Sequence, residues 1–481
     1  MQKKKSLTGV KSLIRSTEGI FELLMLTLIY YLAFRWGYDD ADFPYYLGYG
    51  KYVLCGIYFL LLLVLFFGLD GFKFGYLRNS DVLVSQWIAI FIANFISYWQ
   101  LCLIANAMIS PSPMLILMAV GALIALVCTT SYSAIYHRLY VPKNMAMILG
   151  RDAAVTLKFK METRPDKYHV GKLILVEDGF ESICQQIVNY DAVIINDVPA
   201  QIRNDILKFC YRNKIRTYVT PKITDIIVRG AESINLFDTP LLLVKGNGLT
   251  PSQRIVKRLM DLVLCLLAMI VAAPIMLLVA LAIKLEDGGP VFYKQARASL
   301  GGEVFDILKF RSMIVDAEKE GLSIPATGHD PRITKVGRII RACRVDELPQ
   351  ILNILKGDMS IVGPRPERVE HMDKYGQEIP EFIFRTKVKG GLTGYAQIYG
   401  KYNTSPYDKL RLDMMYIEDY SLMLDIKLIL MTLRIMLKKE STEGFEKIEE
   451  NKQREEEVLE QLHKEHDAAV QNAPEECHPE I

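Results

Sequence analysis

The stretch Asp346-Glu-Leu-Pro-Gln-Ile-Leu-Asn-Ile-Leu-Lys-Gly-Asp-Met-Ser-Ile-Val-Gly-Pro-Arg-Pro366 carries the strongest structural signal in this chain. Its apolar residues follow the i, i+3, i+4, i+7 spacing of a half-buried helix: Leu348, Ile351, Leu352 and Leu355. Asp346 and Glu347 are therefore predicted at or just before a helix N-terminus, with Pro349 tolerated in the first turn. Free N–H groups at such a position favour bound anions, phosphate among them. The ordinary alternative is that Asp346 only caps the helix.

Basic residues flank the acidic pair on both sides. A helical stretch rich in Lys and Arg, 332–344, precedes it, and the turn Gly363-Pro-Arg-Pro366 follows. Because guanidinium groups match the geometry of a phosphate, we predict that arginines clamp a phosphate ester here. Arg365 is the best candidate, since Pro364 and Pro366 fix its backbone. The further candidates are Arg297, Lys309, Arg311 and Arg341. The alternative for basic residues such as these is contact with lipid headgroups.

Length and composition indicate a membrane protein of two or three domains. The chain has 481 residues, of which 51% are apolar. Its eight cysteines are scattered without a CxxC pair, which argues against a disulfide framework or a zinc site. The net charge is +2, but residues 440–481 alone carry 14 acidic and 4 basic side chains. The rest of the chain is therefore basic, which suits anionic substrates and anionic lipids.

Four apolar stretches precede residue 140, at about 19–37, 51–69, 82–104 and 113–133. Each approaches the roughly 20 residues that cross a bilayer. Basic residues lead into the first stretch, lie between the second and third and follow the fourth, whereas the first connection is acidic. The positive-inside rule therefore predicts that both ends of this four-helix region, residues 1–140, face the cytoplasm.

A fifth apolar run extends from Leu262 to Ile283 and contains Pro274 near its middle. Lys257 and Arg258 precede it and Lys284 follows, so both of its ends are basic. A re-entrant helix over 259–284, bent at Pro274 within one leaflet, satisfies the charges and keeps the downstream chain in the cytoplasm. A kinked spanning helix is equally consistent with this segment taken alone.

Residues 145–247 are predicted to form a cytoplasmic α/β domain of Rossmann type. Four short apolar runs read as buried strands, and a helix over 201–212 separates the last two, as in a βαβ unit. Gly150 is the only glycine of the expected first turn, and the G-x-G-x-x-G pattern is missing. Nucleotide binding by this insert and a role as scaffold or oligomerisation domain both stay open.

The chain resembles the bacterial sugar transferases known as monotopic phosphoglycosyl transferases over roughly residues 251–437. The motifs that carry the resemblance are the stretch quoted above and three shorter ones: Lys257-Arg-Leu-Met-Asp261, Phe305-Asp-Ile-Leu-Lys-Phe-Arg-Ser-Met313 and Asp330-Pro-Arg-Ile-Thr334. The resemblance implies three segments: 1–140, four transmembrane helices; 145–247, the insert; and 251–440, a mostly helical catalytic module. Composition adds a fourth, 441–481, an acidic tail that is helical or disordered. Val345 departs from the small residue that we expect before Asp346.

On the matching positions the resemblance implies that Asp346 is a nucleophile forming a covalent phosphosugar intermediate, and that Glu347 and Asp346 hold Mg²⁺. Glu347 would also be catalytic, as acceptor of the proton of the incoming lipid phosphate. The substrate-binding residues would be Arg365, Pro364, Pro366, Arg341, Arg297, Lys309, Arg311, Lys257 and Arg258. The implied reaction transfers hexose-1-phosphate from a UDP-sugar to undecaprenyl phosphate and releases UMP. This step would initiate the synthesis of an exopolysaccharide, capsule or O-antigen.

We accordingly expect a multi-pass protein of the bacterial inner membrane with its catalytic module on the cytoplasmic face. Its partners would be membrane lipid and a second copy of the chain in a homodimer, and no nucleic acid. The competing hypothesis is a catalytically inactive membrane scaffold or sensor whose α/β insert binds a nucleotide. That alternative predicts ligand binding without UMP release and tolerance of Arg365→Ala.

Overall fold

The computed structural model describes residues 2–38, 49–139, 142–150, 155–236, 238–315, 330–400, 404–436, 454, 457–462 and 464. The chain divides into two compact units, one of residues 1–220 with 436–481 and the other of residues 221–435. Most of the predicted acidic tail over 441–481 lies outside the described residues.

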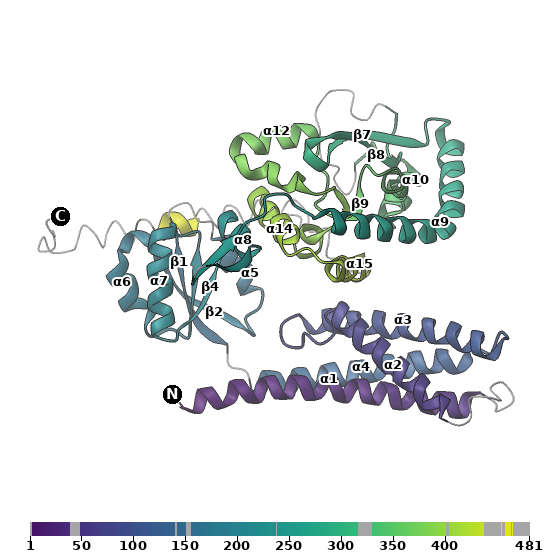
Figure 1. Ribbon diagram of the computed structural model, residues 1–481, viewed down its shortest axis with the longest axis horizontal. Helices are drawn as coiled ribbons and strands as arrows, with labels where there is room; N and C mark the ends of the chain where they lie inside the picture. Colours follow the sequence, from purple (N-terminus) through teal and green to yellow (C-terminus); the bar gives the residue numbers. More distant parts are fainter. Residues whose placement is uncertain are drawn as a thin grey trace, which may run out of the picture. The chain divides into compact units, whose positions relative to one another are not determined.

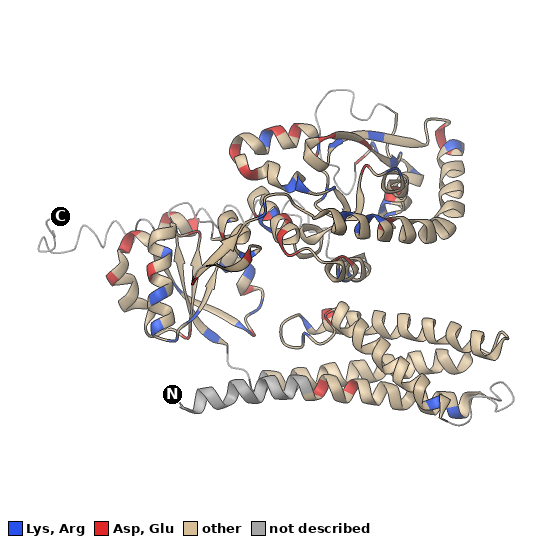
Figure 2. Cartoon of the chain, in the orientation of Figure 1, with Lys and Arg blue, Asp and Glu red and all other residues tan. Residues whose placement is uncertain are grey.

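The N-terminal part consists of four long helices, as predicted: α1 (Gln2–Gly37), α2 (Gly50–Gly68), α3 (Asn79–Ala105) and α4 (Ser112–Leu139). Each contains a segment long and apolar enough to cross a membrane. Figure 2 shows few charged residues in α2, α3, α4 and the coloured part of α1. One exception is Glu22, which is fully buried and accepts a hydrogen bond from Gln86 at 2.9 Å. The helices therefore pack through a polar contact as well as through apolar side chains.

A four-stranded parallel sheet with the order β2-β1-β3-β4 follows. Its strands are β1 (Lys143–Leu149), β2 (Tyr168–Leu175), β3 (Ala192–Asn196) and β4 (Arg216–Val219), and its helices are α5 (Thr156–Glu162), α6 (Phe180–Ile187) and α7 (Ala200–Arg212). Ala146 and Ile148 pack against α6 and α7, whereas Met145 and Met147 pack on the side of α5. Because both faces are covered, β1 is apolar and buried from Met145 to Leu149, and β3 from Ala192 to Ile195. The predicted helix over 201–212 is confirmed as α7 (Figure 1).

The second unit begins with α8 (Ile223–Arg229) and the hairpin of β5 (Glu232–Leu236) and β6 (Thr239–Leu243). The long helix α9 (Pro251–Asp287) leads to a second hairpin, β7 (Phe292–Ala298) and β8 (Val304–Phe310). The remaining elements are α10 (Lys335–Ala342), α11 (Gln350–Lys356), β9 (Ser360–Val362), α12 (Val369–Glu378), the 3-10 segment Pro380–Lys387, β10 (Gly391–Thr393), α13 (Tyr395–Tyr399), α14 (Pro406–Glu418) and α15 (Leu422–Met436).

Helix α9 bends sharply and divides into two arms, with Pro274 inside the helix (Figure 1). Proline removes one backbone hydrogen bond and disturbs the preceding turn, so a bend is expected there. The apolar side chains of both arms are largely exposed: Leu266, Leu267, Ile270, Val271, Leu277, Leu278 and Leu281. This helix is the fifth that is long and apolar enough to span a membrane.

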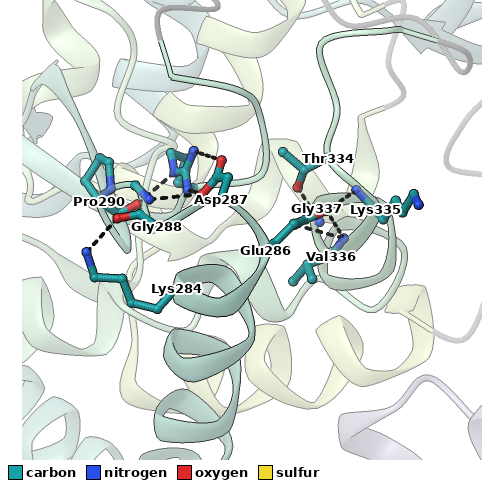
Figure 3. Close-up of polar contacts among 11 residues, drawn as sticks. Lys284, Glu286, Asp287, Gly288, Pro290, Thr334, Lys335, Val336 and Gly337 are labelled. Atoms are coloured by element: carbon teal, nitrogen blue, oxygen red, sulfur yellow. Dashed lines mark hydrogen bonds and ion pairs between the residues drawn. The ribbon is translucent and has the colours of Figure 1, made fainter.

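Both ends of α9 are tied to the same unit by charged side chains. At its start, Arg258 donates hydrogen bonds to the carbonyls of Ile354 and Leu355 at 2.5 and 2.7 Å. At its end, Asp287 pairs with Arg311 (Figure 3). Glu286 accepts a hydrogen bond of 2.8 Å from the backbone N–H of Lys335, at the first turn of α10 (Figure 3).

The predicted apolar stripe around α11 is partly wrong. Ile351 is buried, but Leu352 is 37% exposed, and Ile354 is buried in its place. A 3-10 turn, Val345–Glu347, precedes a helix that starts only at Gln350. Because a 3-10 turn holds three residues instead of 3.6, it rotates the buried face relative to one continuous α-helix.

Candidate active site

Asp346 and Glu347 lie in the 3-10 turn between α10 and α11. The residue before this turn, Arg344, has a φ of 58°, in the left-handed region that side-chain-bearing residues rarely occupy. From this turn Glu347 reaches Lys309 of β8. The acidic pair is therefore not a simple helix cap, which was the ordinary alternative for Asp346.

Glu347 is held by two cations. Lys309 Nζ and Arg365 Nη2 both donate to Glu347 Oε1 at 2.9 Å. The side chain of Glu347 is 15% exposed and that of Lys309 is 20% exposed, so this cluster is largely shielded from water. Burial alone would raise the pKa of Glu347, but Arg365 and Lys309 outweigh it and hold that pKa well below its ordinary value. Glu347 is therefore a carboxylate at any physiological pH.

Asp346 has a different environment, although it is the adjacent residue. Its Oδ1 is buried and accepts no hydrogen bond from the described residues. Burial, with the neighbouring charge of Glu347, raises the pKa of Asp346 above its ordinary value of 3.8. Lys309, Arg341 and Arg344 act in the opposite direction on that pKa. A buried carboxylate oxygen without a partner costs roughly 1–3 kcal/mol or more, so it is a candidate for bond formation.

At the turn that carries Arg365, two backbone segments approach each other closely. A Cβ at Gly391 would lie 2.1 Å from the backbone nitrogen of Gly363, and one at Gly394 would lie 2.1 Å from the Gly363 carbonyl. Only glycine fits at either position. These contacts place β10 against β9 and direct the Pro364-Arg365-Pro366 segment toward Glu347.

Four predicted residues thus come together: Asp346, Glu347, Lys309 and Arg365. Arg341 acts electrostatically on Asp346. Arg297 lies beside the turn and donates to the carbonyl of Pro366 at 3.0 Å, so its contact is with the backbone that carries Arg365.

Three other predicted residues are engaged elsewhere in the same unit. The Arg311 guanidinium pairs with Asp287 and donates to the carbonyl of Pro290 at 2.7 Å. Lys257 is buried against Asp425, and Arg258 binds the C-terminal carbonyls of α11. Substrate binding by these three residues stays a prediction, and their present partners favour a structural role.

Sequence reasoning missed Arg385 and Asp413, which are buried beside the turn. Arg385 Nη2 donates to the carbonyl of Arg365 at 3.0 Å and to Asp413 Oδ2 at 2.7 Å. Neither residue lies in a quoted motif, and each is far along the chain from Arg365. The available signal was the glycine-rich run 390–394, which indicates close backbone contacts next to Arg385.

The acidic pair is compatible with Mg²⁺. Asp346 offers an unpartnered oxygen, and Glu347 is ionised beside it. Among the described residues no group of three or more His, Cys, Asp or Glu side chains lies together. Mg²⁺ usually keeps several waters and binds through one or two carboxylates and substrate phosphates, so this sparse set fits it.

Comparison with known proteins places residues 252–439 in the family described as Bacterial sugar transferase. A UDP-glucose:undecaprenyl-phosphate glucose-1-phosphate transferase of Caulobacter vibrioides is 42% identical over 206 residues, 41% of this chain and 77% of the relative. A UDP-N-acetylgalactosamine-undecaprenyl-phosphate N-acetylgalactosaminephosphotransferase of Aeromonas hydrophila is 36% identical over 262 residues, 52% of this chain and 60% of the relative.

A glucose-1-phosphate transferase of Escherichia coli, named in the same way as the Caulobacter protein, is 40% identical over 211 residues, 43% of this chain and 44% of the relative. The chain spans about half the length of several of these curated relatives. The matched segment contains the acidic pair, its cations and the Pro-Arg-Pro turn. On these similarities the chain belongs to the bacterial sugar transferase family.

Proposed function

We propose that this protein transfers hexose-1-phosphate from a UDP-hexose to undecaprenyl phosphate, releasing UMP, through a covalent intermediate on Asp346. This reaction would be the first membrane step in making an exopolysaccharide, capsule or O-antigen. The relatives named above bear names of undecaprenyl-phosphate sugar-phosphate transferases. The observation that carries the proposal is the unpartnered, buried oxygen of Asp346 beside a carboxylate held by Lys309 and Arg365.

In the first step, an Asp346 carboxylate oxygen attacks the phosphorus that bears the sugar. The bond from that phosphorus to the bridging oxygen of the pyrophosphate breaks, and UMP leaves with the electron pair. Burial removes water from the carboxylate and so favours its attack on phosphorus. Arg365, 39% exposed at the rim of the cluster, is placed to contact the phosphate oxygens on which charge gathers.

In the second step, an oxygen of undecaprenyl phosphate attacks the same phosphorus. The bond between Asp346 and phosphorus breaks, so the carboxylate is restored and the lipid carries a diphosphate sugar. Splitting the transfer in two lets two bulky substrates use one site in turn. The lowered pKa of Glu347 favours a charge-holding role over proton acceptance for this residue.

Glu347 and Asp346 would hold Mg²⁺, which when bound neutralises phosphate charge. Lys309 contributes a second cation through its contact with Glu347. Burial lowers the pKa of Lys309, and Glu347 counters this effect. The ion pair with Glu347 therefore helps to keep Lys309 charged in a shielded site.

We further propose that α9 is re-entrant and that the catalytic module lies on the cytoplasmic face of the inner membrane. What supports this topology is that charged contacts bind both ends of α9 to one unit, while the apolar side chains of both arms are exposed. A straight helix of 37 residues would hold its ends about 55 Å apart.

The parallel sheet of β1–β4 supports a Rossmann-like insert, which we propose as a scaffold and dimerisation domain.

The decisive experiment incubates purified protein, Mg²⁺ and undecaprenyl phosphate with a panel of UDP-sugars and measures UMP release. One UDP-sugar at least is expected to support release that depends on the lipid. Without lipid, a donor labelled in its sugar should leave about one label per active site on the denatured protein. The label should be absent from Asp346→Asn.

The matched control is Asp373→Asn, which changes an exposed carboxyl on α12. It should keep both UMP release and the label. Wild-type rates in Asp346→Asn would remove Asp346 from the mechanism. Nucleotide binding without UMP release for any sugar would instead favour the inactive scaffold.

A further inference from the structure

The backbone from Pro364 to Glu367 is held at each of its carbonyl groups. Gly391 N–H donates to the carbonyl of Pro364 at 2.9 Å, and Ala298 N–H donates to that of Glu367 at 3.0 Å. Between them, the carbonyls of Arg365 and Pro366 accept from the guanidinium groups of two arginines, Arg385 and Arg297, each at 3.0 Å. Two side chains and two strands thus fix four consecutive peptide groups.

Side-chain donors are needed here for a physical reason. Pro364 and Pro366 have no N–H, so this segment cannot join a regular strand ladder through those residues. A backbone of this kind, crossing the edge of an active site, would otherwise leave its carbonyls to water. Arg385 and Arg297 supply charged donors, which form stronger hydrogen bonds than neutral ones.

Arg385 is itself fixed by an anion on another helix. Its Nε and Nη2 donate to Asp413 Oδ2 at 3.0 and 2.7 Å, and its Nη1 lies 3.4 Å from Glu367 Oε1. Its side chain is 4% exposed, and that of Asp413 is 1% exposed. The guanidinium also lies over the ring of Phe382, with a distance of 4.9 Å to the ring centroid. Neither side chain is exposed enough to serve as a first contact for a substrate from solution.

We propose that Arg385 and Asp413 are positioning residues that act through Arg365. Asp413 orients Arg385, and Arg385 holds the Arg365 carbonyl so that the Arg365 guanidinium reaches Glu347 and the transferring phosphate. This inference rests on the proposed function for its effect on rate. The contacts of Arg385 with Asp413 and with the Arg365 carbonyl, called the clamp below, are a property of the fold. A misplacement of about 1 Å in such a group can cost on the order of a hundredfold in rate.

A double-mutant cycle tests the effect on rate, with Arg385→Gln, Arg365→Ala and the double variant assayed for UMP release. Arg385→Gln is expected to lower kcat about a hundredfold with little change in KM for the UDP-sugar. If Arg385 acts through Arg365, the double variant should be no slower than Arg365→Ala alone. Arg385→Lys, which keeps one charged nitrogen as a donor, should recover part of the rate. Additive losses would overturn the proposal.

Hydrogen exchange of the full-length protein tests the clamp without any activity. Peptides containing Ala298, Gly363 and Gly391 should exchange faster in Arg385→Gln and in Asp413→Asn, and those from the α/β sheet should not change. The control, Arg411→Gln, removes a buried arginine of α14 whose Nη1 bonds Asp408 at 3.0 Å within the same helix. It should leave exchange at the turn unaltered. Unaltered exchange in Arg385→Gln would also overturn the clamp.

The two experiments separate the two proposals. If the wild-type protein releases no UMP, the proposed function fails, and the exchange data still decide whether Arg385 holds the turn. If UMP is released but exchange and kcat are normal in Arg385→Gln, the proposed function stands and the positioning role falls.

Discussion

The buried pair of Lys257 and Asp425 offers a test of whether Lys257 binds substrate or anchors α9. Lys257 Nζ lies 2.5 Å from Asp425 Oδ2 and 3.1 Å from the hydroxyl of Tyr416, which itself donates to Asp425 Oδ1 at 2.8 Å. The side chains of Lys257 and Asp425 are 5% and 0% exposed. Lys257→Met would leave a carboxyl buried without its cation.

Breaking a buried ion pair by removing one partner costs roughly 3–5 kcal/mol. For a unit of this size each kcal/mol shifts the unfolding temperature by about 2–4 °C, so the shift should be about 6–20 °C. The measurement is thermal unfolding of the full-length protein in detergent. Unfolding of the second unit is detected by its susceptibility to proteolysis at each temperature. Replacing both partners, as in Lys257→Met with Asp425→Leu, should recover most of this loss, because no unpaired charge is left buried.

The pH dependence of the single variant has a defined sign. Burial raises the pKa of Asp425 above its ordinary value of 3.8, and Lys257 lowers it, so removal of Lys257 raises it further. The folded variant then binds a proton more tightly than the unfolded chain does. Its free energy of unfolding therefore falls as pH rises from about 4 toward the raised pKa. The loss in free energy of unfolding relative to wild type should therefore be smaller at pH 5 than at pH 8.

The double variant distinguishes the two roles. If Lys257 is an anchor, UMP release per folded molecule returns along with stability. If Lys257 binds substrate, stability returns and activity does not. A Lys257→Met protein as stable as wild type would refute the reasoning about the buried pair altogether.

Further predictions concern the site and the membrane. Because burial raises the pKa of Asp346 and the nucleophile must be ionised, kcat/KM should fall as pH drops through that raised pKa, as a pH–rate profile will record. Lys309→Met should move this acidic limb to higher pH, since Lys309 is one of the cations that lower the pKa of Asp346; an unmoved limb would contradict the assignment. Cys343, which is exposed and free, should react with a membrane-impermeant maleimide in inside-out vesicles but not in spheroplasts, with Cys343→Ser as control; labelling in intact spheroplasts would place the module outside. Gly394→Ala should destabilise the second unit in thermal unfolding, because its Cβ would lie 2.1 Å from the Gly363 carbonyl.

Local patterns predicted much of this protein because they depend on neighbours in sequence. Apolar stretches of about 20 residues predicted the four N-terminal helices, and short runs predicted the four strands of the parallel sheet, although β4 was expected to be buried and is not. The acidic pair and the Pro-Arg-Pro turn also belong to one continuous stretch, so their residue types alone indicated a site for a phosphate ester. The bend in α9 follows the proline within it.

The pairing of charges could not be predicted in this way, because it depends on which segments meet in space. The sequence does not distinguish the roles of the basic residues Arg365, Arg311 and Lys257. In the structure Arg365 reaches Glu347, Arg311 binds Asp287, and Lys257 is buried against Asp425. The opposite pKa shifts of Asp346 and Glu347 likewise come from partners 38 residues before and 18 residues after Glu347, since Lys309 and Arg365 both donate to Glu347 Oε1.

The sequence alone thus determined which segments are membrane-length helices, where the sheet lies and which residue types gather around Asp346. Only the tertiary structure decided which of the basic side chains face the acidic pair and which hold the backbone, as Arg385 does at the carbonyl of Arg365. The physical reason is that hydrophobic periodicity is a property of local chain geometry. Ion pairing instead depends on distances of a few ångströms between groups that only folding brings together.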